Sequence, residues 1–257
     1  LDDFLPFFGR SFVPLPQNYN NEKQKRMKQI FFSLILSAAT LPLAAMTTQN
    51  HNSESATAVQ KLIFVPDSLK PYNLNDDNAR WCWRHSAQTQ NIVYFWEKPF
   101  GDNPQNPPSL EGKPMKFDLG NLQTQVERFY HFFRDTLKFS LPGSICDQYK
   151  MMVMVNYSLE GTAYGGTYDD FIGALWVTPN RIQDQKLNCL AHELGHSFQL
   201  QIMADRTGEA WGGSGFFEMT SQWMLWRVNP DWITDEKYHF DAFRQLTHKG
   251  YLHLDNI

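Results

Sequence analysis

The stretch from Lys23 to Ala45 determines which part of this 257-residue chain is expected to fold. Basic residues at 23–28 precede an apolar run of 16 residues, 30–45, that ends in small side chains. This is the pattern of a secretory signal peptide, and the run is shorter than the roughly 20 residues that usually span a bilayer. A buried core helix and an uncleaved anchor are the alternative interpretations. We expect an exported, extracytoplasmic protein that is cleaved after Ala45 and then has no stable membrane span.

The same stretch sets the expected domain boundaries. Met27 stands where an initiator would, so residues 1–26 are interpreted as upstream read-through and residues 27–45 as the signal peptide. Residues 46–80 are mostly polar and are predicted to form an N-terminal extension with one short strand at 61–65. Residues 81–257 are predicted to form the main folded domain.

Composition excludes several classes of protein. Hydrophobic residues make up 42% of the chain and charged residues 19%, which excludes a disordered or collagen-like chain. Lys and Arg total 23 against 27 Asp and Glu, so no basic field exists to bind nucleic acid. Cys82, Cys146 and Cys189 predict one disulfide and one free thiol in an oxidising compartment, without indicating the pair.

Hydrophobic patterning predicts an α+β fold. Three apolar runs have the length of strands: 92–96, 151–155 and 171–177. Helices are predicted at 122–139, 184–204 and 216–228. Loops rich in proline or glycine are predicted at 99–114, 161–166 and 211–215. Strands and helices in this order are typical of the α+β class.

The motif His192-Glu193-Leu194-Gly195-His196 lies inside the helix predicted at 184–204. Residues four positions apart lie on the same side of a helix, so both imidazoles can reach one metal ion. Glu193 lies about 100° around the helix from His192, where it can hold a water molecule beside the ion without ligating it. A metal-free structural role is the alternative interpretation of the motif.

Two histidines leave a catalytic zinc site one protein ligand short. The extended zinc motif HExxHxxGxxH would need a glycine at position 199 and a third histidine at position 202, but this chain has Gln199 and Ile202. Glu218 is the stronger candidate, because it lies at the start of the next predicted helix, just after a glycine-rich loop. Glu209 competes with it, but lies in a predicted turn that holds a side chain less firmly.

The pattern His192-Glu193-x-x-His196 followed by Glu218-x-x-Ser221 resembles the gluzincin metallopeptidases. More narrowly, residues 191–199 and 215–222 are similar to a group of uncharacterised secreted bacterial proteins of metallopeptidase type. The resemblance extends over roughly 170–230. It implies a zincin-like fold with a mixed sheet, a backing helix, an active-site helix and a helical C-terminal part that is incomplete in this chain. It also implies that His192, His196 and Glu218 bind Zn²⁺, with Glu193 as the general base.

Further roles follow from the same resemblance. Gln222 stands where thermolysin-type members have an Asp that orients a ligating histidine, and its carbonyl can accept the imidazole N–H. Ser221 belongs to the same helical motif. The strand predicted at 172–177 would be the substrate-binding edge strand, with Ala174 and Trp176 as contacts; simple packing is the alternative. Possible oxyanion donors follow Glu218: Tyr238, His239, His248, Tyr251 and His253.

These features predict a secreted zinc metallopeptidase that hydrolyses peptide bonds in a peptide, protein or glycoprotein. One alternative is a catalytically weak glycan- or metal-binding surface protein on a zincin scaffold. Another is a peptidase directed at mucin-type glycoproteins. Trp223 and Trp226 are interpreted as core residues of a helix rather than as a glycan platform. The sequence does not predict an oligomeric state.

Overall fold

The computed structural model describes residues 60–208, 214–231, 241 and 244–245. The chain divides into two compact units, Leu1–Ala56 and Thr57–Ile257, and every described residue belongs to the second. The predicted read-through and signal peptide lie outside the described residues, as does the part of the extension before residue 60. Within the described residues, no helix is long and apolar enough to cross a membrane.

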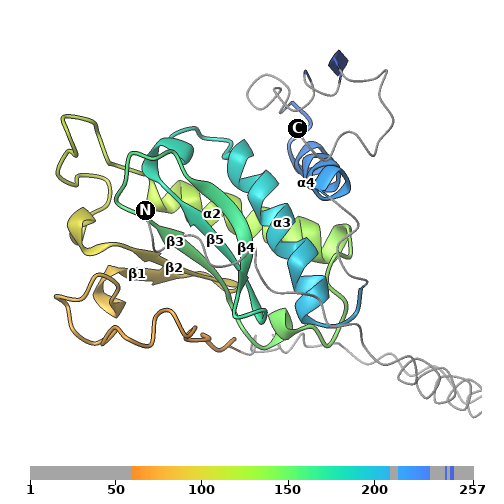
Figure 1. The fold of residues 1–257 in the computed structure, drawn as a ribbon, viewed down its shortest axis with the longest axis horizontal. Helices are drawn as coiled ribbons and strands as arrows, with labels where there is room; N and C mark the ends of the chain where they lie inside the picture. The colour runs from red at the N-terminus through yellow and green to blue at the C-terminus, as the bar shows by residue number, and fades with distance from the viewer. Residues whose placement is uncertain (1–59, 209–213, 232–240, 242–243, 246–257) are drawn as a thin grey trace, which may run out of the picture. The chain divides into compact units, whose positions relative to one another are not determined.

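A five-stranded mixed sheet forms the centre of this unit (Figure 1), with the strand order β1-β2-β3-β5-β4. The strands are β1 (Ser86–Gln88), β2 (Ile92–Trp96), β3 (Met151–Val155), β4 (Ala163–Tyr168) and β5 (Ile172–Val177). The three inner strands run parallel, and the edge strands β1 and β4 run antiparallel to their neighbours. Every residue of β2 and β3 is buried, as expected of parallel strands covered on both faces. The predicted α+β class is confirmed.

The strand predictions were correct where the apolar runs are continuous. The strands at 92–96 and 151–155 are confirmed, and the one expected at 171–177 begins one residue later. The loop predicted at 161–166 is wrong, because residues 163–168 form β4. Glycines have little strand preference of their own, and the hydrogen bonds to β5 stabilise this strand. In place of the strand expected at 61–65, Leu62 makes a single bridge to Tyr149.

Three helices lie on one side of the sheet. They are α2 (Leu119–His131), α3 (Asn188–Ala204) and α4 (Ser214–Val228). The Asp118 side chain caps α2 by accepting a hydrogen bond from the backbone N–H of Asn121, and a π-helical turn at Phe132–Thr136 follows the helix. The helices expected at 184–204 and 216–228 are therefore confirmed within a few residues at each end.

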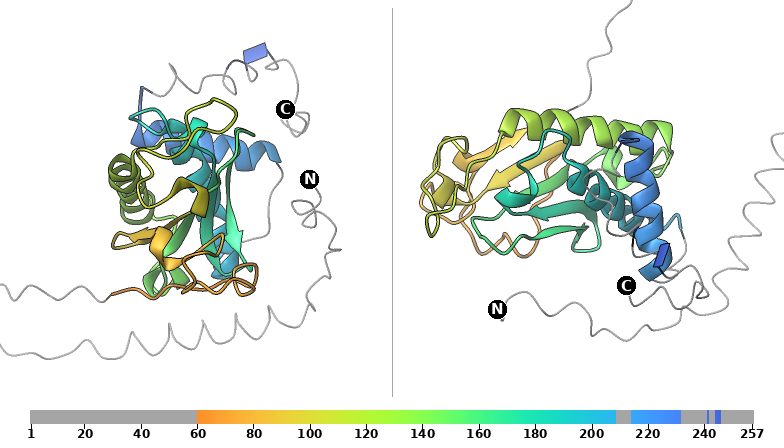
Figure 2. Two further views of the ribbon diagram at one scale, coloured as in Figure 1. Left: turned by 90° about the vertical axis from the view of Figure 1, so that its left-hand side faces the viewer. Right: turned by 90° about the horizontal axis from the view of Figure 1, so that it is seen from above.

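Cross-strand register shows which face the helices cover. Tyr94, Val153, Leu175 and Gly165 form one row across the sheet. The Tyr94 hydroxyl donates to the carbonyl of Gln123 in α2, and Gly165 contacts α3, so both helices lie against the same face. Helix α4 packs on the side of α3 that faces away from the sheet (Figure 1). It runs across the direction of α2, and one of its ends lies next to α2 (Figure 2).

Residues 60–85 pack against the sheet as part of the same unit. Leu69 and Leu74 are buried in the core, and the ring of Trp83 lies 5.2 Å from that of Phe95. Arg80 donates to the buried carboxylate of Glu97 at 2.6 and 2.9 Å. The stretch expected to be an extension therefore contributes, from residue 60 onward, to the core of the main domain.

The predicted disulfide is wrong, because no disulfide joins Cys82, Cys146 and Cys189. The fold gives the two buried thiols other partners. The Cys82 sulfur lies 3.3 Å from Nδ1 of His85, and Ser144 donates a hydrogen bond to the sulfur of Cys146 at 3.3 Å.

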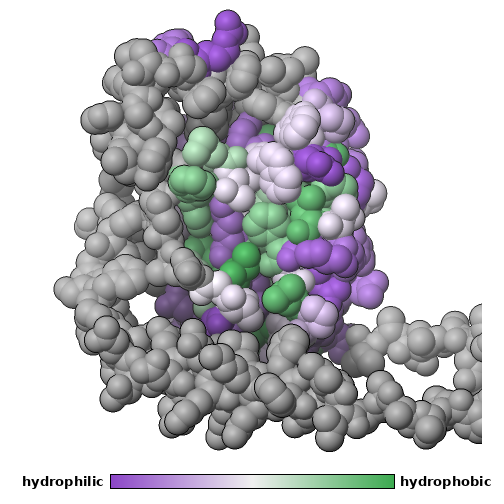
Figure 3. Space-filling model, turned by 90° about the vertical axis from the view of Figure 1, so that its right-hand side faces the viewer, coloured by the Kyte–Doolittle hydropathy of each residue, from purple (hydrophilic) through white to green (hydrophobic). Residues whose placement is uncertain are grey.

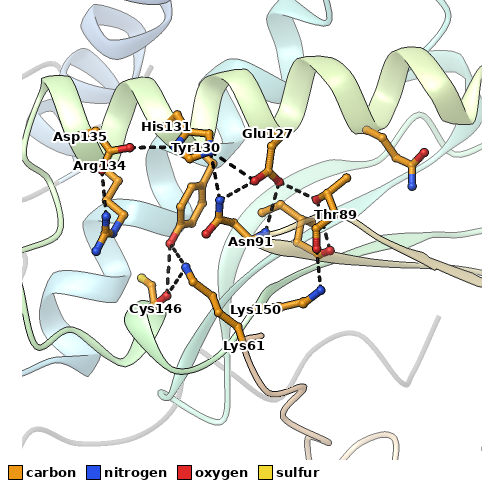
Figure 4. A network of polar contacts seen from close by, with 12 residues as sticks. Lys61, Thr89, Asn91, Glu127, Tyr130, His131, Arg134, Asp135, Cys146 and Lys150 are labelled. Atoms are coloured by element: carbon orange, nitrogen blue, oxygen red, sulfur yellow. Dashed lines mark hydrogen bonds and ion pairs between the residues drawn. The ribbon is translucent and has the colours of Figure 1, made fainter. Parts of the chain in front are cut away.

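A polar network ties α2 to the start of β2 and to the N-terminal segment (Figure 4). The carboxylate of Glu127 accepts hydrogen bonds from Thr89 Oγ1 at 2.5 Å and from the side-chain amide of Asn91. Lys61 Nζ donates to the Tyr130 hydroxyl at 3.0 Å and to the Cys146 carbonyl at 2.6 Å, and burial lowers the pKa of this lysine. The network fixes the position of α2 on the sheet.

Replacement of Glu127 by alanine should destabilise the fold. The change removes the acceptor of Thr89 and leaves the buried amide of Asn91 with only its longer contact to His131 Nε2 at 3.3 Å, so the free energy of unfolding should fall by about 1–3 kcal/mol. Chemical denaturation of the full chain measures the change. Glu160→Ala, at an exposed position, is the control and should leave stability within about 0.5 kcal/mol of the parent. Equal stability of the two variants would show that the network contributes nothing.

Candidate metal centre

The position of α3 is set by apolar packing and by buried polar contacts to the sheet. Its apolar side chains, Leu190, Ala191, Leu194 and Phe198, are buried. Ser197 donates to the carbonyl of Ala174 at 2.7 Å, and the backbone N–H of Gly173 donates to Gln201 at 2.8 Å. Both Ser197 and Gln201 are fully buried, so α3 has a defined rotation about its own axis. That rotation directs His192 and His196 toward α4 and Glu193 toward β4.

Three ligating atoms meet between α3 and α4. Nε2 of His192 lies 3.0 Å from Nε2 of His196, and Oε2 of Glu218 lies 3.1 and 3.3 Å from these two nitrogens. A tetrahedral zinc ion with bonds of 2.0–2.1 Å separates its ligand atoms by about 3.3 Å. The spacing of the three atoms therefore fits a small tetrahedral cation. Within the described residues, this is the group of His, Cys, Asp and Glu side chains suited to holding a metal ion.

Two glutamines orient the histidine rings. Gln199 donates its amide N–H to the Phe217 carbonyl at 2.9 Å, so its own oxygen faces His196 Nδ1 at 2.9 Å as an acceptor. The oxygen of Gln222 lies 2.7 Å from Nδ1 of His192 in the same way. Each Nδ1 is therefore a donor, and each neutral imidazole directs the lone pair of Nε2 toward the centre of the site.

This orientation argues for a cation at the centre. Two nitrogen lone pairs and one carboxylate oxygen converge from about 3 Å, and such groups repel one another unless a positive charge lies between them. Both imidazoles are buried, so bulk water does not screen this repulsion. The donor set of two imidazoles and one carboxylate is one that zinc uses in catalytic sites.

The pKa shifts of His192 and Glu218 also indicate that the site favours a positive charge beside the Glu218 carboxylate. Burial lowers the pKa of His192, but the nearby carboxylates of Glu218 and Glu193 outweigh burial and leave the pKa above its usual value. Burial raises the pKa of Glu218, but hydrogen bonds with His192 and His196 outweigh it and hold the pKa well below its usual range. The site therefore favours a negative carboxylate facing a positive charge.

Glu193 lies beside this centre and is held by the edge strand. The backbone N–H of Gly165 in β4 donates to Oε2 of Glu193 at 2.9 Å. Burial raises the pKa of Glu193, while the two imidazoles and the Gly165 N–H oppose the rise without cancelling it. A side chain at position 165 would put its Cβ 1.7 Å from the Glu193 carbonyl oxygen, so only glycine allows this approach. A raised pKa beside a cation site suits a proton acceptor.

A second close approach brings Glu218 to the histidines. A Cβ on Gly195 would lie 2.5 Å from Ser221 Oγ and 3.2 Å from Ser221 Cα, so glycine allows α4 to approach α3. Ser221 also donates a hydrogen bond to the carbonyl of His192. At the C-terminal end of α4, Arg128 donates to the Val228 carbonyl at 3.1 Å and to Asn229 at 2.6 Å. These contacts hold α4 at its middle and at its C-terminal end.

The prediction that residues 172–177 form the substrate-binding edge strand is wrong. Strand β5 pairs with β3 on one side and with β4 on the other, so neither Ala174 nor Trp176 lies on a free edge. Ala174 is buried, and Trp176 packs between Tyr164 and Tyr168 at 5.7 and 4.7 Å. The edge next to the metal centre belongs to β4, the strand that sequence patterning did not detect.

The structure brings together every other predicted site residue: His192, Glu193, His196, Glu218, Ser221 and Gln222. Sequence reasoning missed Gln199, Gly165 and Tyr164. Gln199 had a usable signal, because it lies one turn after His196 on the same helix. The predicted oxyanion donors and the competing Glu209 lie outside the described residues.

Comparison with known proteins places this domain in a family. The model of a family of unknown function, DUF6055, matches residues 55–257. The chain belongs to the DUF6055 family. No curated protein and no solved structure matches it. The matched region includes the sheet, the helices α2, α3 and α4 of the described residues, and the candidate metal centre.

Replacement of Gly195 by alanine should push α3 and α4 apart. Alanine favours a helix more than glycine does, so a loss of stability would come from the collision with Ser221. We expect the free energy of unfolding to fall by about 1–3 kcal/mol, and Zn²⁺ to bind more weakly. Gly120→Ala in α2 is the matched control, since its Cβ would make only an ordinary contact at 3.4 Å. Denaturation and zinc titration of the full chain check both effects; unchanged zinc affinity in Gly195→Ala would contradict the role of this contact.

Replacement of Gln199 by leucine should weaken the metal centre without unfolding the domain. The change removes the acceptor that orients the His196 ring, and losses of this kind lower metal affinity by about 10–100-fold. A competition titration with a chelator, using Zn²⁺ as the probe ion, measures the change. Gln185→Leu, at an exposed position before α3, is the control and should bind like the parent.

Proposed function

We propose that this DUF6055 protein is an exported zinc-dependent peptidase. The observation that carries the proposal is the convergence of two imidazole lone pairs and one carboxylate on a single point, with the partly buried carboxylate of Glu193 beside it. His192, His196 and Glu218 would hold Zn²⁺. This geometry goes beyond the sequence motif, because Glu218 and the partner of the His192 ring, Gln222, come from a separate helix.

Zinc bound in such a set acidifies water to a pKa of about 7 and polarises a carbonyl group. Glu193 would accept the proton of the attacking water and deliver it to the leaving amine nitrogen. Its hydrogen bond to the Gly165 N–H holds the carboxylate beside the ligands, leaving the second oxygen for the water. Glu193 therefore has the position, the burial and the raised pKa that a general base needs.

The outer edge of β4 is suited to bind an extended peptide. Among the described residues β4 pairs with β5 alone, so its other edge has backbone groups for a further strand. The Gly165 N–H on that edge already reaches Glu193, which places a peptide bound there next to the general base. Tyr164 is 55% exposed on the same strand, and burial and the charge of Glu193 together raise the pKa of its hydroxyl. It would contact a substrate side chain.

The variant Glu193→Gln separates chemistry from metal binding. It should keep zinc, because Glu193 is not a ligand, and should lose about 100-fold or more in kcat/KM on unstructured protein substrates. His192→Ala should lose both zinc and activity. Zinc content by mass spectrometry and cleavage of a quenched peptide library, both with the full chain, give the two readouts.

Glu160→Gln, an exposed neighbour of β4, is the matched control and should cleave like the parent. Zinc binding without cleavage in the parent would favour the alternative of a metal- or glycan-binding surface protein. Cleavage that requires a glycosylated mucin and disappears after deglycosylation would favour the mucin-type peptidase. Cleavage by Glu193→Gln at the parental rate would overturn the assignment of the general base.

A further inference from the structure

Exposed aromatic side chains gather at two places in the described structure. On α4, Trp223 and Trp226 are 42 and 48% exposed, so the interpretation of both as core residues was wrong. Figure 3 faces the side on which α4 lies and shows apolar side chains exposed there among polar ones. The second place is strand β4, where Tyr164 is 55% exposed. Tyr164 adjoins the outer edge of the sheet beside the candidate metal centre, so this second place is the one with a backbone edge for a ligand.

Hydrogen bonds show which residues of β4 direct their backbone groups away from the sheet. The backbone N–H of Gly165 donates to Glu193 rather than to β5. Backbone groups alternate in direction along an antiparallel pair, so those of Ala163 and Thr167 also point to the outer edge. The groups of the residues between them point to β5. A peptide that adds to β4 therefore pairs with positions 163, 165 and 167.

The side chains of β4 alternate between the two faces of the sheet. A Cβ on Gly165 would meet the carbonyl of Glu193, so the odd-numbered positions face α3. Tyr164 faces the opposite side, where its ring lies 5.7 Å from that of Trp176. A Cβ on Gly166 would lie 2.9 Å from Cε1 of Tyr164, so the tyrosine ring extends along the strand over Gly166. The ring thus forms an exposed apolar surface next to the outer edge.

The β4 edge lacks the features by which edge strands usually avoid pairing. Such edges have charged side chains, proline or a bulge. The strand Ala163–Tyr168 has neither a charged residue nor a proline, and its register with β5 runs without a bulge. The carboxylate that reaches this edge, that of Glu193, is the proposed general base. The residues of β4 therefore leave the edge suited to backbone pairing at the point where the chemistry is proposed.

The alternation of faces determines which side chains of a bound peptide meet Tyr164. The reacting residue of the peptide is the one opposite Gly165, because the general base is bound there. Directly opposite residues point to the same face, so this residue faces α3 and its two neighbours in the peptide face Tyr164. Opposite and diagonal Cβ atoms are about 4.5–8 Å apart, which an aromatic side chain can bridge. A neighbour of the reacting residue therefore contacts the tyrosine ring.

We propose that Tyr164 makes the site prefer extended peptides with an aromatic residue next to the reacting residue. The aromatic side chain packs on the exposed face of the Tyr164 ring, while the reacting residue directs its own side chain to the other face of the sheet. The inference rests on the proposed peptidase function, since it names the substrate class of the same site. Aromatic pairs across neighbouring strands should favour such peptides by about 2–10-fold.

Cleavage-site profiling with the zinc-loaded full chain and an unstructured peptide library tests the preference. The parent should favour Phe, Tyr or Trp by about 2–10-fold at a position within two residues of the cut. Tyr164→Ser should remove this preference and leave the cleavage of peptides with alanine at that position unchanged. Tyr164→Phe retains the ring and should restore the preference. Leu141→Ser, at an exposed position in the loop 138–144, is the control and should match the parent.

Residue-resolved amide exchange in the non-cleaving variant Glu193→Gln tests the pairing separately from the chemistry. An aromatic peptide should slow exchange at the outward amides of Ala163 and Thr167, and leave the amides already bonded to β5 unchanged. The same peptide with alanine in place of the aromatic residue should need about 2–10-fold higher concentration for equal protection. Adding Tyr164→Ser should make the two peptides equivalent.

The outcomes separate this inference from the proposed function. Cleavage by the parent without an aromatic preference, or with a preference that Tyr164→Ser retains, refutes the inference and leaves the peptidase function standing. Absence of cleavage, together with protection of β4 that depends on the aromatic residue, refutes the peptidase function and supports Tyr164 as the aromatic contact. A requirement for a glycan on the peptide, or protection that depends on protein concentration through pairing of two copies, also contradicts the inference.

Discussion

The close contact between Gly195 of α3 and Ser221 of α4 is the constraint on which the rest of the site depends. Most helix pairs keep their axes 8–10 Å apart, and a side chain at position 195 would prevent the approach seen here. The contact brings the Glu218 carboxylate within 3.3 Å of both imidazoles. Because Ser197 and Gln201 bind α3 to β5 and Arg128 binds the end of α4, the two helices have little freedom to separate.

The polar contacts around the centre also explain how a charged cluster is accommodated in a buried position. Each histidine donates to a glutamine oxygen, and each ring nitrogen that remains faces the same point as Glu218. Neutral amides make the imidazoles less basic than carboxylate partners would. The proposed zinc centre would therefore have less basic histidine ligands than an arrangement with carboxylate partners. Glu193 gains a second constraint from β4, since its carboxylate is bound by a backbone N–H rather than by a mobile side chain.

The sheet and α4 connect this chemistry to the surface of the molecule. Strand β4 is an edge strand and approaches α3 closely through Gly165, so the edge and the general base are adjacent. Helix α4 places Glu218 in its first turns and has the exposed side chains of Met219, Trp223 and Trp226 on its outer side.

The features that depend on local spacing could be predicted from the sequence alone. His192 and His196 lie one turn apart in any helix, Glu218 follows at the start of the next helix, and the continuous apolar runs at 92–96 and 151–155 form buried strands. Features that depend on pairing between distant segments could not be predicted. The stretch 163–168 has weak strand preference and becomes a strand because β5 pairs with it, which in turn moves the free edge from β5 to β4. The absence of a disulfide, the ring contact of Gln199 and the exposure of Trp223 and Trp226 have the same origin. These features arise in the folded chain, because backbone pairing and helix packing determine which side chains meet, and neither can be read from the spacing of residues along one segment.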